Sequence, residues 1–155
     1  MANIRHSFEL ADTKQTLAEG LKEYFAANPM LKRDVDLLSP STRQFFRSHD
    51  AVHVVYGCST TMLDEAVVKL ASIFGTTGGI NVLRGYAHRE TLDIYQNLPI
   101  GSTLLALLIS PYLIVRTIWR CTRQLKQWPW EQHEEFLPMP LRELRSQFGI
   151  KVAHE

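Results

Sequence analysis

Prolines and glycines divide this chain into helix-length segments, and that division limits its possible folds more than any other feature. The main breaks are Asn28-Pro29, Gly57, the glycines at 75, 78 and 79, and Pro99 with Gly101. Between the breaks, apolar residues recur at the spacing of one helix face, and no segment shows the sustained alternation of a strand. The sequence therefore predicts an all-α fold, a compact multi-helix bundle.

Each expected helix has a recognisable start or stop. Asn28-Pro29 ends the first, because a residue before proline avoids the α region. Thr61-x-x-Asp64 matches a capping box at the start of the third. The expected helices run from Asp12 or Thr13 to Ala27, from about Ser41 to Tyr56, from Thr61 to Phe74, from Ile80 to Gln96, from Pro111 to Gln127, and from Leu141 to Phe148 with Gly149 as its stop.

Length and composition predict one globular domain. The 155 residues contain 45% hydrophobic and 21% charged residues, as in ordinary folded proteins. We expect one domain over 1–155, with an N-terminal helix and linker over 1–39 and a helical core over 40–150. A net charge of +1 gives no overall attraction to nucleic acid, and none is expected as a partner. Two cysteines without a C-x-x-C pair, and no signal peptide, predict a cytoplasmic protein.

The segment around residue 50 combines metal-binding residue types. His49 and His53 are four residues apart, so on a helix both imidazoles point to one side. Asp50 lies three residues before His53, at the edge of the same face. Two nitrogen donors and a carboxylate in this arrangement favour a divalent metal, although two histidines at this spacing also occur by chance on ordinary helices.

Glu65 completes the predicted site if the chain reverses direction. On one continuous helix, Glu65 would lie twelve positions after His53, about 18 Å along the axis, too far for a shared ion. A turn centred near residue 59 would instead bring the two residues level in an antiparallel helical hairpin. Asp64 is a rival, but we favour Glu65 because Asp64 is the capping-box partner of Thr61. The predicted metal ligands are His49, Asp50, His53 and Glu65.

This motif resembles that of a known family. H-D-x-x-H, eleven residues and then Glu is similar to the pattern of the coenzyme Q (ubiquinone) biosynthesis protein 4 family. The chain also has Trp130-Glu131, the run from Pro140 to Arg145 and Phe148-Gly149-Ile150, which look like the closing pattern of that family. The resemblance covers about residues 40–150 and suggests a short or divergent bacterial-type member. Only 48 residues precede the motif, and Asp64 replaces a common glycine.

The resemblance implies a function as well as a site. It implies metal-dependent decarboxylation with hydroxylation at ring carbon one of a polyprenylated hydroxybenzoate, a lyase-type reaction. The expected cofactor is zinc, with iron, manganese or magnesium as alternatives, because mixed histidine and carboxylate ligands suit several divalent ions. The expected partners are an isoprenoid lipid or quinone precursor, other proteins of a biosynthetic complex, and a second copy in a homodimer.

Two other functions are kept open. In one, the metal is structural and the protein is a non-catalytic lipid-binding or complex-organising protein. In the other, His49 and Asp50 belong to a His-Asp-type phosphohydrolase, with His6 and Asp93 as further ligands. The protease pattern H-E-x-x-H is excluded because Asp50 stands where that pattern has glutamate.

A charge-free stretch over residues 97–115 raises the question of membrane contact. Pro99, Gly101 and Pro111 interrupt it, so we expect two buried segments and not a span. After it, Ile114, Ile118, Cys121 and Leu125 are expected on the buried face of an amphipathic helix. The basic residues Arg116, Arg120 and Arg123 are expected on the solvated face, where they could meet anionic lipid headgroups. Such contact would make the protein peripheral to the inner membrane.

Overall fold

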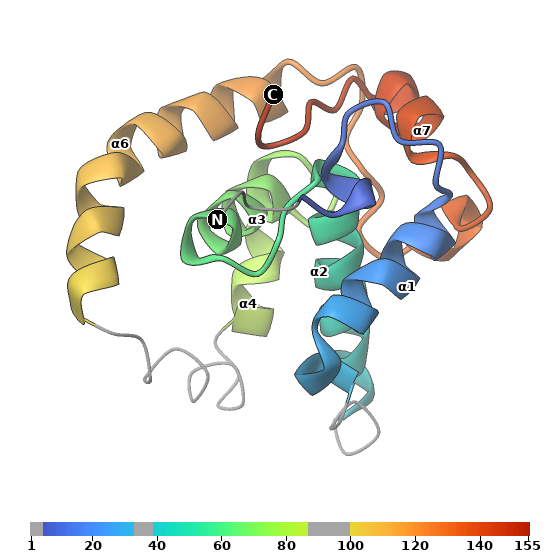
Figure 1. Ribbon diagram of the computed structural model, residues 1–155, viewed down its shortest axis with the longest axis horizontal. Coiled ribbons are helices and arrows are strands. Elements are labelled where there is room, and N and C mark those ends of the chain that lie inside the picture. The colour runs from blue at the N-terminus through green and yellow to red at the C-terminus, as the bar shows by residue number, and fades with distance from the viewer. Residues whose placement is uncertain (1–4, 33–38, 87–99) are drawn as a thin grey trace.

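Helices α2 (Pro40–Tyr56) and α3 (Met62–Phe74) form a helical hairpin at the centre of the molecule (Figure 1). The computed structural model describes residues 5–32, 39–86 and 100–155. The Ser39 side chain accepts the Thr42 N–H and caps α2, while Thr61 caps α3 by accepting the Asp64 N–H. The pattern of breaks in the sequence thus positions both arms of the hairpin.

The reversal between the two helices depends on Gly57. Its φ of 64° lies in the left-handed region, which glycine adopts without steric cost. The Cys58 N–H bonds the His53 carbonyl and the Gly57 N–H bonds the Val54 carbonyl, the pair of bonds that defines a Schellman motif. This C-cap turns the chain back within a few residues and sets the level at which α3 begins.

The other helices pack around this hairpin. Figure 1 shows α1 on one side of α2, α3 and α4 on the other, and α6 arching along the outside. Among the described residues there is no strand, so the prediction of an all-α fold is confirmed. The remaining elements are α1 (Leu17–Ala27), α4 (Val82–Tyr86), α6 (Ile100–Thr122), α7 (Leu141–Phe148) and the short 3-10 helices Ser7–Glu9, Pro29–Lys32, Gly79–Asn81 and His133–Phe136.

The second half of α2 is buried on all sides, as in a central helix. Ala51, Val52, Val54 and Val55 have no exposed surface, and neither has His53 between them. The side chains packed around them include Leu17 of α1, Val68 of α3, and Leu141 and Leu144 of α7. A buried histidine in the middle of this core requires polar partners, because an unpaired polar group in such surroundings is costly.

Arg145 of α7 is buried in the same region, with 4% exposure. Its guanidinium donates to the carbonyls of Phe8, Leu10, Val54 and Val55 at 2.5 to 2.9 Å. Val54 and Val55 lie in the last turn of α2, where carbonyls lack helical partners and a positive charge is favourable. One side chain therefore joins α7, the N-terminal segment and the end of α2.

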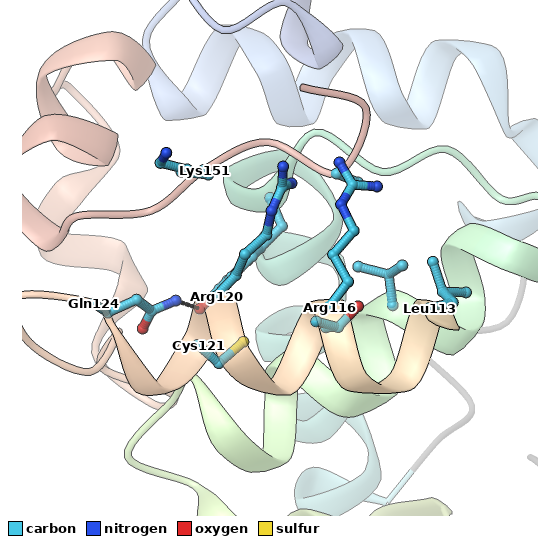
Figure 2. A pocket seen from close by; sticks show the side chains of 10 residues that line it. Leu113, Arg116, Arg120, Cys121, Gln124 and Lys151 are labelled. Atoms are coloured by element: carbon cyan, nitrogen blue, oxygen red, sulfur yellow. Dashed lines mark hydrogen bonds between the residues drawn. The ribbon is translucent and has the colours of Figure 1, made fainter. Parts of the chain in front are cut away.

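Two other arginines tie α6 to the C-terminal segment (Figure 2). Arg120 donates to the carbonyls of Val152 and Glu155, and Arg116 donates to the carbonyl of Glu155. Both line a small cavity of about 20 Å³, together with Lys151 and neutral residues that include side chains of α2, α3 and α6. These two guanidinium groups are therefore engaged and not simply solvated, contrary to the expectation from sequence.

The start of the first helix differs from the prediction. Thr16, and not Asp12 or Thr13, caps α1: its side chain accepts the Glu19 N–H, and the Glu19 carboxylate accepts the Thr16 N–H. This reciprocal capping box satisfies the backbone N–H groups of both Thr16 and Glu19. The end of the helix, next to Asn28, agrees with the prediction.

Helix α6 continues through Pro111, where two separate segments were expected. A proline inside a helix removes one backbone hydrogen bond and bends the helix without necessarily ending it. Figure 1 shows α6 changing direction along its length. The helix ends at Thr122 instead of Gln127, and Leu125, expected on the buried face, is 77% exposed.

Part of the expected helix from Ile80 to Gln96 lies outside the described residues, as do residues 97–99. Within the described part, a 3-10 turn at Gly79–Asn81 leads into α4, which ends at Tyr86. In the portions of the chain that the structure describes, no helix has both the length and the apolar character needed to cross a bilayer.

Candidate metal centre

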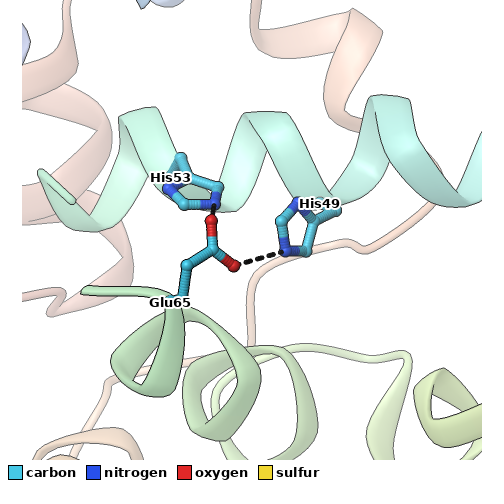
Figure 3. Close-up of side chains that lie close together, drawn as sticks. All are labelled: His49, His53 and Glu65. Atoms are coloured by element: carbon cyan, nitrogen blue, oxygen red, sulfur yellow. Dashed lines mark ion pairs between the residues drawn. The ribbon is translucent and has the colours of Figure 1, made fainter. Parts of the chain in front are cut away.

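His49 and His53 of α2 and Glu65 of α3 converge on one point of the hairpin (Figure 3). The Nε2 of His53 is 3.2 Å from one Glu65 oxygen, and the Nε2 of His49 is 3.8 Å from the other. One ligand atom from each residue lies within 4.8 Å of the others. The four-residue spacing on α2 and the reversal at Gly57 therefore produce the predicted cluster of two imidazoles and one carboxylate, which could hold a metal ion.

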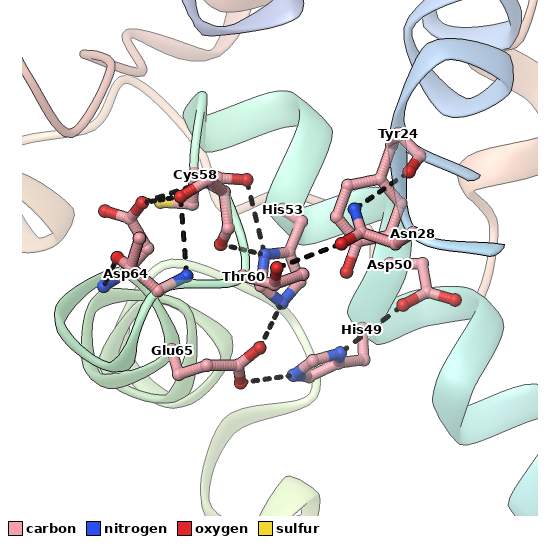
Figure 4. Close-up of polar contacts among 11 residues, drawn as sticks. Tyr24, Asn28, His49, Asp50, His53, Cys58, Thr60, Asp64 and Glu65 are labelled. Atoms are coloured by element: carbon pink, nitrogen blue, oxygen red, sulfur yellow. Dashed lines mark hydrogen bonds and ion pairs between the residues drawn. The ribbon is translucent and has the colours of Figure 1, made fainter. Parts of the chain in front are cut away.

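The turn after α2 fixes the proton position on His53 (Figure 4). Its Nδ1 lies 3.0 Å from the Ser59 carbonyl and 3.3 Å from the Cys58 carbonyl. Carbonyl oxygens only accept hydrogen bonds, so Nδ1 must carry the proton. In neutral His53 the lone pair is then on Nε2, which faces Glu65. Backbone carbonyls on the far nitrogen orient metal-binding histidines in the same way.

The Nε2 nitrogens of His49 and His53 face the Glu65 carboxylate without a hydrogen bond to it. Within the described structure, both ring nitrogens of His49 and the Nε2 of His53 are buried without a hydrogen-bond partner. A lone pair facing a carboxylate at 3.2 Å is repulsive unless a proton or a metal cation lies between them. Two ligands bound tetrahedrally to zinc at about 2.1 Å are roughly 3.4 Å apart, close to the spacing of these atoms. The residues present therefore fit a divalent metal.

Asp50, the fourth predicted ligand, does not point into the cluster. Its carboxylate is 3.6 Å from the Nδ1 of His49, on the opposite side of the ring from Glu65. Neighbouring residues on a helix point about 100° apart, so His49 and Asp50 cannot both face one ion directly without rearrangement. The arrangement resembles the carboxylate–histidine–metal pattern, in which the acid favours a proton on Nδ1 and leaves Nε2 for the metal.

The carboxylate of Asp64 stabilises the turn between α2 and α3. It accepts the backbone N–H of Ser59 at 3.0 Å and the Ser59 hydroxyl at 2.5 Å, and it pairs with His154 at 3.1 Å. The expected reciprocal half of the capping box, from Asp64 back to Thr61, is thus replaced by bonds to Ser59. Asp64 is committed to the loop, and the next residue, Glu65, faces the imidazoles.

Charges in the cluster shift the pKa values of the two closest groups. Burial alone would lower the pKa of His53, but the carboxylate of Glu65 beside Nε2, with a contribution from the charge of Asp50, raises it above its ordinary 6.5. Burial would raise the pKa of Glu65, but the close contact with His53 and the charges of both histidines lower it below its ordinary 4.5. In the metal-free protein, both shifts favour a charged pair.

These shifts predict how the stability of the metal-free protein depends on pH. The contribution of His53 is complete below pH 6.5 and is lost as the pH rises through its raised folded-state pKa. The contribution of Glu65 is complete above pH 4.5 and is lost as the pH falls through its lowered pKa. The pair should therefore stabilise the fold most between pH 4.5 and 6.5. At alkaline pH its contribution to the free energy of unfolding should be smaller by up to about 2 kcal/mol.

Urea unfolding with a chelator, at pH 5.5 and pH 9, measures this dependence. The quantity to compare is the free energy of unfolding of the wild type minus that of Glu65→Gln, because other titrating groups cancel in the difference. A difference that stays constant between these pH values would contradict the assignment.

Sequence reasoning missed the residues that surround the cluster. The ring of Tyr24 in α1 lies 5.1 Å from that of His53, and the rings of Phe45 and Tyr86 lie 5.9 and 5.8 Å from that of His49. Burial, the charges of Asp50 and Glu65 and a hydrogen bond to Asp50 raise the pKa of Tyr24, so its hydroxyl stays protonated. Nothing in the local sequence around Tyr24 indicates this contact, which depends on how α1 packs.

The other histidines do not contribute to the cluster in the described part of the chain. His6 lies 3.6 Å from Glu23 and stacks on Phe8, so it does not supply the extra ligand of a His-Asp phosphohydrolase. Asp93, the other ligand of that hypothesis, lies outside the described residues.

Comparison with known proteins identifies no relative. No family model, no curated protein and no solved structure matches this chain. The function of the protein is therefore inferred from the geometry of the site and from the motif around His49 and His53.

Proposed function

We propose that this protein binds one divalent metal through His49, His53 and Glu65 and uses it to act on the ring of a polyprenylated hydroxybenzoate. The main support for a bound metal is that the buried Nε2 nitrogens of His49 and His53, which have no hydrogen-bond partners among the described residues, converge on the carboxylate of Glu65. The ring substrate, and the replacement of its carboxyl group at carbon one by a hydroxyl group with oxygen as oxidant, come from the motif resemblance.

The ligand set supports a catalytic role for the metal. Two histidines and one glutamate leave at least one position for water or substrate, as in catalytic zinc sites. The same set, two histidines and one carboxylate, holds iron(II) in oxygen-using enzymes. When bound, the ion would supply a Lewis acid for a phenolate or carboxylate oxygen, and iron would also supply redox chemistry.

The residues of the chain have distinct tasks in this proposal. The carbonyls of Cys58 and Ser59 hold His53 with Nε2 toward the ion, and Asp50 does the same for His49. The side chain of Glu65 is 22% exposed while those of both histidines are almost covered, so substrate would approach from the Glu65 side. Hydrophobic rings around His49 keep bulk water away from that nitrogen.

A hollow next to the site supports an aromatic or isoprenoid ligand. It has a volume of about 240 Å³, and its walls combine Phe45, Val82 and Trp130 with polar residues that include Glu131. Phe45 also stacks beside His49, so the hollow and the metal cluster share one wall. Aromatic and apolar side chains such as these are the usual lining of pockets for small organic ligands.

Turnover with a defined metal tests this function. We expect the zinc- or iron(II)-loaded protein to convert a prenylated 4-hydroxybenzoate in the presence of oxygen, with release of carbon dioxide. Glu65→Gln and His53→Ala should lower the rate at least 100-fold, because each removes a metal ligand. Glu143→Gln, an exposed acid of α7, is the matched control and should keep full activity.

The second candidate is a structural metal in a lipid-binding or complex-organising protein, and the complete burial of His53 in the core favours it. In that case the loaded protein turns nothing over, and removal of the ion unfolds the α2–α3 hairpin. Circular dichroism before and after chelation, measured beside the turnover assay, separates the two functions.

A further inference from the structure

The outer face of α6 presents large apolar side chains to the surroundings. Tyr112, Val115 and Trp119 are 70%, 68% and 51% exposed. Their spacing of three and four residues places them on one face, while Thr117 and Cys121 on the opposite face are buried. Tyrosine and tryptophan are the residues that concentrate where a protein meets the interface of a bilayer.

The charged side chains of α6 and of the residues that follow it are all basic. Between residues 97 and 130 the sequence contains no aspartate or glutamate and four basic residues, although the net charge of the whole chain is only +1. Arg123 lies over the Trp119 ring at 4.4 Å, and Lys126 follows shortly after the helix. On the neighbouring side, Arg116, Arg120 and Lys151 line the cavity in Figure 2, whose lining contains no acidic side chain.

We propose that α6 docks this protein on a bilayer surface that contains anionic lipid. Tyr112, Val115 and Trp119 would enter the headgroup region, and Arg123 and Lys126 would contact lipid phosphates. An amphipathic helix of this kind lies in the interface and does not span, and its binding combines buried apolar area with attraction to anionic lipid. The inference does not depend on the metal centre.

Charge favours a bilayer over a second copy of the chain on this face. In a symmetric dimer, the same patch would face itself and bring basic residues of both copies together. An anionic lipid surface has the complementary sign. The bilayer is therefore the occupant for which both the apolar and the charged residues of this face are suited.

Sedimentation with lipid vesicles tests the proposal. We expect the full chain to bind vesicles of phosphatidylcholine with 30% phosphatidylglycerol at low salt, and to bind pure phosphatidylcholine weakly. Binding should decrease in high salt, because the attraction between exposed charges is screened. Tryptophan fluorescence should shift to the blue, a signal that reports Trp119 because Trp128 and Trp130 are only 0% and 7% exposed.

Three variants locate the contact. Tyr112→Ser with Trp119→Ser should weaken binding at least about ten-fold. Arg123→Gln with Lys126→Gln should weaken binding to anionic vesicles by about five-fold for each cation removed, and leave the weak binding to neutral vesicles almost unchanged. Ile80→Ser is the matched control, since Ile80 is 73% exposed but lies outside α6.

Several results would overturn the proposal. One is that the protein does not bind anionic vesicles, and another is that Ile80→Ser weakens vesicle binding as much as the α6 variants do. A third is that the protein forms a dimer in size-exclusion chromatography, which the Tyr112 and Trp119 changes dissociate, and does not bind vesicles. Since His53→Ala should still bind vesicles, failure of the metal proposal is distinguishable from failure of this one.

Discussion

Replacing Glu65 with glutamine should weaken zinc binding at least 100-fold. Zinc contributes about 10–16 kcal/mol in small sites with four ligands, roughly 3 kcal/mol per ligand, and 1.4 kcal/mol corresponds to a factor of ten. Glutamine keeps the shape of the side chain but removes the charge that lies between His53 and His49. His53→Ala should have an effect of similar size, because it removes the nitrogen that the turn orients.

Metal content and thermal unfolding measure this effect independently. Purified wild-type protein should contain about one equivalent of metal, and Glu65→Gln should contain almost none. With zinc at 100 times its Kd, binding stabilises the folded state by about 2.7 kcal/mol, which corresponds to a rise in Tm of roughly 5–10 °C for a chain of this size. The Tm of Glu65→Gln should not change with zinc.

Asp50→Asn is the informative companion variant. If Asp50 only orients His49, its loss should cost about 10- to 100-fold in affinity, and the visible spectrum of the cobalt(II)-loaded protein should keep its ligand pattern. A changed cobalt spectrum would instead show that Asp50 moves to bind the ion directly. Glu143→Gln should bind as the wild type does. Wild-type protein without affinity for zinc, iron(II) or manganese would disprove the metal centre.

The hairpin could be predicted from sequence because its determinants are local. Gly57 is the residue that a left-handed C-cap requires, and Thr61 is a good helix cap, so the break and the restart are both visible in the sequence. Once the turn is placed near residue 59, the separation of His53 and Glu65 places the two residues level with each other. The sequence favours Glu65 over Asp64 because Asp64 is expected to complete the capping box of Thr61. In the structure the Asp64 carboxylate instead accepts hydrogen bonds from Ser59.

The orientation of Asp50 could not be predicted from the same local rules. The spacing places Asp50 near His49 but does not say whether its carboxylate turns toward the ion or away from it. In the structure, Tyr24 of α1 contributes a hydroxyl to Asp50, and this contact depends on the packing of α1 against α2. Contacts between residues far apart in the chain leave no periodic pattern in the sequence.

The error in α6 has a similar origin. Helical periodicity assigned Ile114 and Leu125 to the buried face, yet they are 39% and 77% exposed. Sequence hydropathy ranks Thr117 below both residues, but Thr117 is buried where α6 meets α3. An apolar residue on a surface helix indicates either a core face or a contact surface, and only the packed structure distinguishes the two.

Arg145→Leu should destabilise the fold by at least about 4 kcal/mol, a large part of the 5–15 kcal/mol typical of a domain. Leucine retains apolar contacts but removes four charge-assisted hydrogen bonds. The carbonyls of Val54 and Leu10 keep a backbone donor, whereas those of Phe8 and Val55 would be left unpaired, at about 1–3 kcal/mol each. Burial lowers the pKa of Arg145 only to about 10, so the wild-type side chain is still charged at neutral pH and favours the C-terminal end of α2.

Arg145→Lys separates the charge from the hydrogen-bond geometry. Lysine keeps a cation, but its single ammonium cannot reach four carbonyls on two different segments as the planar guanidinium does, so we expect an intermediate loss of stability. Arg142→Leu, one turn earlier in α7 and half exposed, is the control and should change the free energy of unfolding by less than about 0.5 kcal/mol. Guanidinium unfolding measures all three variants.

Because the α2 end held by Arg145 also carries His53 and the turn that orients it, Arg145→Lys should weaken zinc binding in addition to lowering stability. Wild-type stability in Arg145→Leu would show that the four carbonyls find other partners and that this arginine does not hold the hairpin in place.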